Sequence, residues 1–148
     1  MNGSESKRDW PNSYASIISM MLYLASNTRP DISFSVHQFA RFTHNTKLSH
    51  KIAVNSICRY LQGTKDNNLV FISSKKLVVD CYAGADFSGI WGHENLQDPI
   101  CSGSRTGFVI TFSNFLMLWV SKQQTEISLS TIHYEYVALS HSVVALLT

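Results

Sequence analysis

Charged residues are scarce in this sequence, cysteine is rare, and no hydrophobic run is long. Asp, Glu, Lys and Arg make up 15% of the 148 residues, the formal net charge is only +2, and hydrophobic residues make up 45%. Disordered chains combine low hydrophobicity with high net charge, so this composition predicts a globular protein with one buried core or two small ones. The basic residues form no dense block, and composition alone therefore does not demand a nucleic-acid partner.

The three cysteines and the N-terminus bear on compartment. Cys58, Cys81 and Cys101 lie far apart without the paired spacing of a metal site, so we expect reduced thiols and an intracellular protein. The apolar segment from Tyr14 to Ala25 is too short to cross a membrane, and no signal-peptide pattern precedes it. The sequence thus predicts a chain of the cytoplasm or nucleus, with no targeting signal and no membrane contact.

The first part of the chain has the hydrophobic spacing of three helices. The apolar residues that recur at this spacing are Tyr14, Ile17, Ile18, Met21 and Ala25, then Ile32, Val36, Phe39 and Ala40, then Val54, Ile57, Cys58 and Leu61. Ser13 is placed to cap the first helix, Pro30 lies at the first turn of the second, and Gly63 is placed to end the third.

After Gly63 the hydrophobic pattern becomes that of strands. Runs rich in β-branched, apolar and aromatic residues occur at 70–72, 77–83, 106–112 and 116–120. The sequence SN between the last two runs predicts a tight hairpin, and residues 89–104 are expected to form a loop.

Alternation predicts the two faces of the strand that begins at Leu77. The residues expected on its buried face are Leu77, Val79, Cys81 and Ala83, and those expected on the opposite, polar face are Asp80, Tyr82, Gly84 and Asp86. A long amphipathic helix is expected from Ser130 onward. The residues on its apolar face, which we expect to pack on the sheet, are Ile132, Tyr136, Leu139, Val143 and Leu146.

Several unusual strings occur in a fixed order, namely LYLASNTRPDISFSVHQFARFTHN, ICRYLQGTKDNNLVF, RTGFVITF, LWVSKQQTEISLST and EYVALS. They resemble the C-terminal part of the Pol polyprotein of copia-type LTR retrotransposons. The resemblance implies an α/β (α+β) chain with two parts. Residues 1–64 are similar to the helical segment after the reverse-transcriptase core, and residues 65–148 are similar to the first half of a ribonuclease H domain, with a three-stranded antiparallel sheet and one amphipathic helix.

In that family, ribonuclease H cleaves the RNA of an RNA–DNA hybrid with two Mg²⁺ ions, which need several converging carboxylates. The resemblance places the first catalytic acid at Gly84, where the carboxylate is missing, and the second at Glu135, where it is retained as an ancestral metal ligand. Asp86 is a substitute candidate, but two steps along a strand displace a side chain by roughly 6 to 7 Å, too far for the same metal site.

The start of the last helix departs from the family in a second place. The family pattern has a Ser cap followed by a Glu that closes a capping box, and His133 stands here where that Glu is expected. Loss of the box should cost about 0.5 to 2 kcal/mol, by analogy with cap removal.

Other chemistries are weaker alternatives. His133 and Glu135 are two residues apart and face different sides of a helix, so a metal or hydrolytic site built from them with His93, Asp86 or His141 is disfavoured. The serines at 102, 104 and 130 have no nearby base in a recognisable nucleophile motif.

The combined interpretation is a degenerate, catalytically inactive part of a copia-type polyprotein, truncated before the later acids of the family, with no bound cofactor. The alternative is a non-catalytic module that binds nucleic acid or a protein partner, in which Arg105, Lys122 and the pair Lys75 and Lys76 would contact phosphates. We also expect self-association through the bare outer edge of the strand at 77–83.

Overall fold

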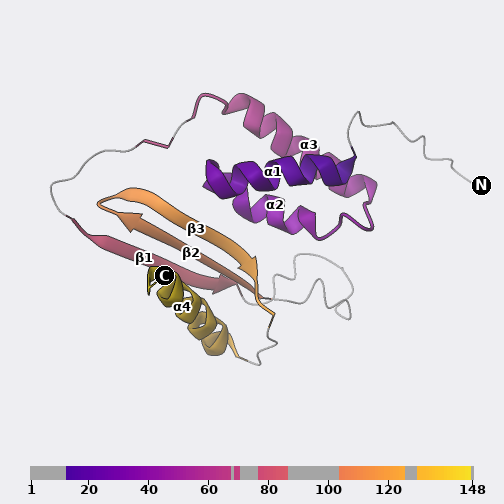
Figure 1. Ribbon diagram of the computed structural model, residues 1–148. Helices are drawn as coiled ribbons and strands as arrows, with labels where there is room; N and C mark the ends of the chain where they lie inside the picture. The colour runs from indigo at the N-terminus through magenta and orange to yellow at the C-terminus, as the bar shows by residue number, and fades with distance from the viewer. Residues whose placement is uncertain (1–12, 68, 71–76, 87–103, 126–129, 148) are drawn as a thin grey trace, which may run out of the picture.

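The computed structural model describes residues 13–67, 69–70, 77–86, 104–125 and 130–147. Its elements, in chain order, are α1 (Tyr14–Asn27), the 3₁₀ turn η1 (Pro30–Ile32), α2 (Ser33–Ala40), α3 (Leu48–Gly63), β1 (Val79–Asp86), β2 (Arg105–Phe112), β3 (Phe115–Gln123) and α4 (Thr131–Leu147). The sheet lies between two helical layers, with α1 to α3 on one side and α4 on the other (Figure 1). The α+β fold expected from the sequence is confirmed.

The helices at the start of the chain form where hydrophobic spacing predicts them. The hydroxyl of Ser13 caps α1 by accepting a hydrogen bond from the Ser16 amide at 3.3 Å. The core that unites the three helices consists of Tyr14, Ile18, Met21, Ala25, Ile32, Val36, Val54 and Ile57. Burial of these side chains, each worth about 1.5 to 3 kcal/mol for a large aliphatic residue, is the main force that holds this layer together.

A polar network ties the start of η1 to the end of α3. Arg29 forms a bidentate ion pair with Asp31, at 3.0 and 2.8 Å, and also donates to the carbonyl and hydroxyl of Thr64. The Tyr60 hydroxyl donates to the same carboxylate at 2.8 Å. These contacts hold the pKa of Asp31 below its ordinary value, and the first cause is the hydrogen bond from Arg29.

The sheet is an antiparallel meander in the order β1–β2–β3. The turn between β2 and β3 has two central residues, Ser113 and Asn114, both with positive φ (50° and 69°), which is the geometry that matches the right-handed twist of a hairpin. The predicted hairpin is therefore confirmed. Strand β1 begins two residues later than expected and continues to Asp86.

The sequence-based prediction of which α4 face packs on the sheet is wrong. The buried residues of α4 are Tyr134, Ala138 and Ser142, whereas the large apolar residues of the predicted face are exposed, and these are Ile132, Tyr136, Leu139, Val143 and Leu146. The reason is steric. Small side chains at positions 138 and 142 let the helix approach the sheet, where Phe108 and Ile110 are buried.

The predicted buried face of β1 is also wrong. Leu77 is 76% exposed and Val79 is 54% exposed, and Ala83 is exposed as well. Among the described strands β1 lies at the edge of the sheet, so its side chains have a strand neighbour on one side only.

The two helical layers contact the sheet through specific polar bonds as well as apolar packing. The indole N–H of Trp119 in β3 donates to the carbonyl of Ala25 in α1 at 2.6 Å.

A division into domains at residue 64 stays a prediction. No helix within the described ranges has the length and apolar character needed to span a membrane.

Some predictions fall outside the described residues. They concern most of the short strand at 70–72, all but the last residue of the loop at 89–104, and the residues Lys75, Lys76, His93, Cys101 and Ser102.

Candidate functional site around Gly84 and Glu135

The hydrogen-bonding pattern of β1 determines what its outer edge presents. The Ser113 amide donates to the Val78 carbonyl at 2.7 Å, and the antiparallel register continues from this pair through the whole of β1. Because hydrogen-bonded and non-hydrogen-bonded pairs alternate, the even-numbered residues of β1 bond to β2. The odd-numbered residues direct their N–H and C=O groups away from β2, toward the edge.

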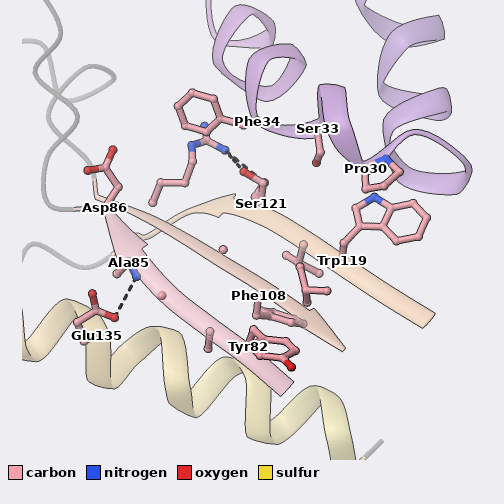
Figure 2. Close-up of a pocket in the computed structure, with 16 residues that line it drawn as sticks. Pro30, Ser33, Phe34, Tyr82, Ala85, Asp86, Phe108, Trp119, Ser121 and Glu135 are labelled. Atoms are coloured by element: carbon pink, nitrogen blue, oxygen red, sulfur yellow. Dashed lines mark hydrogen bonds between the residues drawn. The ribbon is translucent and has the colours of Figure 1, made fainter. Parts of the chain in front are cut away.

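Glu135 meets one of these outward-facing amides. The Ser130 hydroxyl accepts from the His133 amide at 3.3 Å, which confirms Ser130 as the cap of α4 and fixes where the helix begins. Glu135 then lies in the second turn, and its Oε2 accepts a hydrogen bond from the Ala85 amide at 3.1 Å (Figure 2). The carboxylate therefore satisfies a donor on the edge strand, which is a structural contact between α4 and β1.

Gly84 adjoins this contact in the sequence and has no side chain to contribute. It pairs with Gly107 of β2, so the sheet carries two glycines side by side. A Cβ added at Gly84 would meet no atom within 4 Å. Gly84 is therefore not required by close packing, and the position has room for a larger residue.

A cavity of about 670 Å³ opens beside these residues and is lined by Gly84, Asp86 and Glu135 together. Its other walls are largely apolar and include Phe34, Tyr82, Phe108 and Trp119 (Figure 2). The structure thus brings the three sequence-predicted positions to one cavity. Asp86 is exposed and, as predicted, lies on the same face of β1 as Gly84.

These three positions do not fit two magnesium ions. A two-metal site needs several carboxylates that converge on ions about 4 Å apart. Gly84 provides none, one oxygen of Glu135 accepts the Ala85 amide, and Asp86 is two residues along the strand from Gly84. Within the described part of the chain, no group of three or more His, Cys, Asp or Glu residues is arranged to hold a metal ion.

The residues of the weaker alternatives are dispersed in the structure. His133 and His141 are both exposed on α4, and Ser104 is buried immediately before β2. The Ser104 carbonyl accepts from the Gln124 amide at 2.7 Å, which places this serine in the framework of the sheet.

Arg105, which the sequence suggests as a phosphate contact, is only 8% exposed. Its guanidinium donates to the carbonyl and hydroxyl of Ser121, both at 3.2 Å, and lies over the ring of Phe34 at 5.5 Å. It also donates to Gln38 of α2 at 3.2 Å. Burial lowers the pKa of Arg105 from its ordinary value, the nearby charge of Arg41 lowers it further, and the charge of Asp86 opposes this shift.

Sequence reasoning missed Gln38 and Arg41. They are three residues apart, and this spacing places two side chains on the same side of a helix. The sequence could therefore have indicated that they act together. The hydrogen bond from Arg105 to Gln38 joins positions 67 residues apart. Hydrophobic periodicity cannot reveal such a contact.

Comparison with curated proteins gives relatives over most of the chain. A retrovirus-related Pol polyprotein from transposon TNT 1-94 of Nicotiana tabacum is 35% identical over 129 residues, which is 87% of this chain and 9% of the relative. The Pol polyprotein from transposon RE1 of Arabidopsis thaliana is 29% identical over 89% of this chain and 8% of its own length. The chain thus spans less than a tenth of these two relatives.

A third relative is much shorter. Secreted RxLR effector protein 161 of Plasmopara viticola is 29% identical over 87% of this chain and 85% of its own length. No protein-family model matches the chain, and no solved structure matches it. Over nearly nine-tenths of its length the chain is similar to a segment of transposon Pol polyproteins, which confirms its resemblance to the copia-type retrotransposon family.

Proposed function

We propose that this chain derives from the C-terminal part of a copia-type retrotransposon Pol polyprotein, namely the helical segment after the reverse-transcriptase core and part of the ribonuclease H domain, and that it has no hydrolytic activity at the Gly84 and Glu135 positions. The observation that carries the proposal is the state of these two positions. One has no side chain, and the carboxylate of the other accepts a hydrogen bond from the Ala85 amide of the edge strand.

The chemistry explains why one carboxylate is not enough. Hydrolysis of a phosphodiester by two metals requires each ion to be held while the attacking and leaving oxygens are clamped between them. Magnesium requires near-octahedral coordination and gives up its bound water reluctantly. A single exposed carboxylate therefore binds it weakly. On this basis Glu135 serves to fasten α4 to β1, and its ancestral role as a metal ligand is lost.

The test is cleavage of the RNA strand in an RNA–DNA hybrid with Mg²⁺ present. The purified chain should show no cleavage, and the Gly84→Asp variant should also show none, because carboxylates at positions 84 and 135 do not by themselves complete a two-metal site. An active ribonuclease H in the same buffer serves as the positive control. Cleavage by the unaltered chain that disappears in Glu135→Ala would overturn the proposal, because it would assign the activity to this site.

A further inference from the structure

A second cavity, of about 530 Å³, lies between the α1–α2 layer and β3. Its polar lining includes Ser33, His37 and Arg41 from the helices and Arg105 and Ser121 from the sheet. Among the described residues that line it there is no Asp or Glu. The cavity therefore gathers positive charge without a carboxylate in its wall.

The two arginines converge on a single neutral oxygen. Arg41 Nη1 donates to Gln38 Oε1 at 2.8 Å, and Arg105 Nη2 donates to the same oxygen at 3.2 Å. Two guanidinium groups repel each other, and a neutral amide oxygen compensates this repulsion far less than a carboxylate would. The arrangement therefore lacks a negative charge at the point where the two arginines meet.

Unsatisfied donors mark the same place. Arg41 Nε and Nη2 are buried and have no hydrogen-bond acceptor among the residues that the structure describes. Buried donors are normally paired, and an unpaired one indicates a missing partner. In the described residues the only ion pair is that of Arg29 with Asp31, so neither arginine of the cavity has a carboxylate partner there.

The electrostatic environment of the cavity is positive. Burial lowers the pKa of His37, and the positive charge of Arg105 lowers it further. Asp86 acts on Arg105 from a distance but forms no ion pair with it in the described structure. A negative ligand would relieve the repulsion among these groups.

We propose that this cavity is a binding site for a small molecule that carries a phosphate group, held by Arg41 and Arg105 with the hydroxyls of Ser33 and Ser121 beside them. Guanidinium groups match phosphate oxygens in planar, paired geometry, and hydroxyl groups serve as further donors. Phosphate is favoured over a carboxylate because two arginines converge, so a dianion is matched better than a single charge.

The burial of Arg105 and of two Arg41 nitrogen atoms limits the size of the ligand. Arg105 is 8% exposed, so its guanidinium is not displayed on the surface as a contact for an extended phosphate backbone. A compact terminal or free phosphate can enter a cavity of this volume. The phosphodiesters of a nucleic acid, which are flanked by sugars on both sides, fit it less well.

The experiment is a calorimetric titration of the full chain with inorganic phosphate at constant ionic strength. We expect saturable binding at one site. The Arg41→Gln variant should bind phosphate about tenfold more weakly or worse, as expected when a charged hydrogen-bond partner is removed. The Arg59→Gln variant removes the same charge from an exposed position on α3 and should leave the affinity unchanged.

A second variant supplies the missing negative charge from within the protein. Gln38→Glu is nearly isosteric and places a carboxylate between the two guanidinium groups. It should raise the melting temperature in the absence of phosphate and weaken phosphate binding by about tenfold or more, because the internal carboxylate takes the place of the ligand. This variant keeps the test decisive even if Arg41→Gln folds poorly.

Four results would overturn the proposal. One is no saturable phosphate binding by the unaltered chain, and another is unchanged affinity in both Arg41→Gln and Gln38→Glu. The third is equal competition by a single-stranded oligonucleotide without a terminal phosphate, which would assign the site to a nucleic-acid backbone. Equal weakening in Arg59→Gln would also contradict the proposal, because it would show an effect of net charge alone. None of these readouts depends on hydrolytic activity.

Discussion

At the scale of single residues, Glu135 has a role that its ancestry does not suggest. The resemblance identifies it as a metal ligand, whereas the structure shows its Oε2 accepting the Ala85 amide at 3.1 Å. The direction of that amide follows from the alternation of β1 pairs, which in turn depends on the register set at Val78 and Ser113. The geometry thus gives Glu135 a structural contact that does not depend on a carboxylate at position 84.

This role predicts the effect of removing the carboxylate. Glu135→Ala should lower the free energy of unfolding by about 0.5 to 1.5 kcal/mol, because one exposed hydrogen bond between α4 and β1 is lost. Glu135→Gln keeps an oxygen acceptor and should cost less. Urea unfolding measures both variants, and amide hydrogen exchange should become faster at Ala85 in Glu135→Ala. Equal stability of all three proteins would show that the bond contributes nothing.

At the scale of elements, α4 shows where sequence patterns mislead. Its large apolar residues recur with helical spacing, which predicts the wrong packing face. The true contact is made by Tyr134, Ala138 and Ser142, two of which are too small to stand out in a hydrophobic pattern. By contrast, α1 to α3 and the Ser113–Asn114 hairpin were predictable, because caps, proline and turn residues act locally.

Substitutions on the buried and the exposed face of α4 should differ in their effect on stability. Ala138→Leu should destabilise the protein by about 1 to 3 kcal/mol, because Ala138 is fully buried and a larger side chain overfills the contact with the sheet. Leu139→Ala should have a much smaller effect, since Leu139 is 53% exposed. Thermal or urea unfolding gives both values. The opposite order would restore the face that the sequence predicts.

At the scale of the whole molecule, the described sheet ends at β1, whose odd-numbered residues direct their backbone groups outward. Glu135 meets the Ala85 amide at one end of this edge. Val79 is 54% exposed at the other end, and α4 adds an exposed apolar stripe nearby. Apolar strand edges and apolar patches both favour pairing between chains.

We therefore expect the protein to self-associate at micromolar concentration in analytical ultracentrifugation. Proline in place of Val79 should reduce this association without unfolding the protein, because the Val79 amide faces away from β2 and proline there removes no bond between β1 and β2. A stable monomer at these concentrations would contradict the prediction. Loss of the fold in Val79→Pro would show that the amide is directed toward β2.

The contacts between the layers were the least predictable part of the molecule. The bond from Trp119 to Ala25 and the meeting of Arg105 with Gln38 each join segments far apart in sequence. Their positions depend on how the sheet lies against the helices, which no local pattern encodes. The family motifs identified Gly84 and Glu135, and the shared cavity and the Ala85 bond became visible only in the folded chain.

Whether Glu135 can hold magnesium at this site can be measured by a magnesium titration followed by NMR at the Ala85 amide and the Glu135 side chain. We expect no saturable shift in the unaltered chain at millimolar Mg²⁺, and a measurable shift in Gly84→Asp, where a further carboxylate joins Asp86 and Glu135 in the lining of the cavity. Saturable Mg²⁺ binding at Glu135 in the unaltered chain, abolished by Glu135→Gln, would show that Glu135 still acts as a metal ligand.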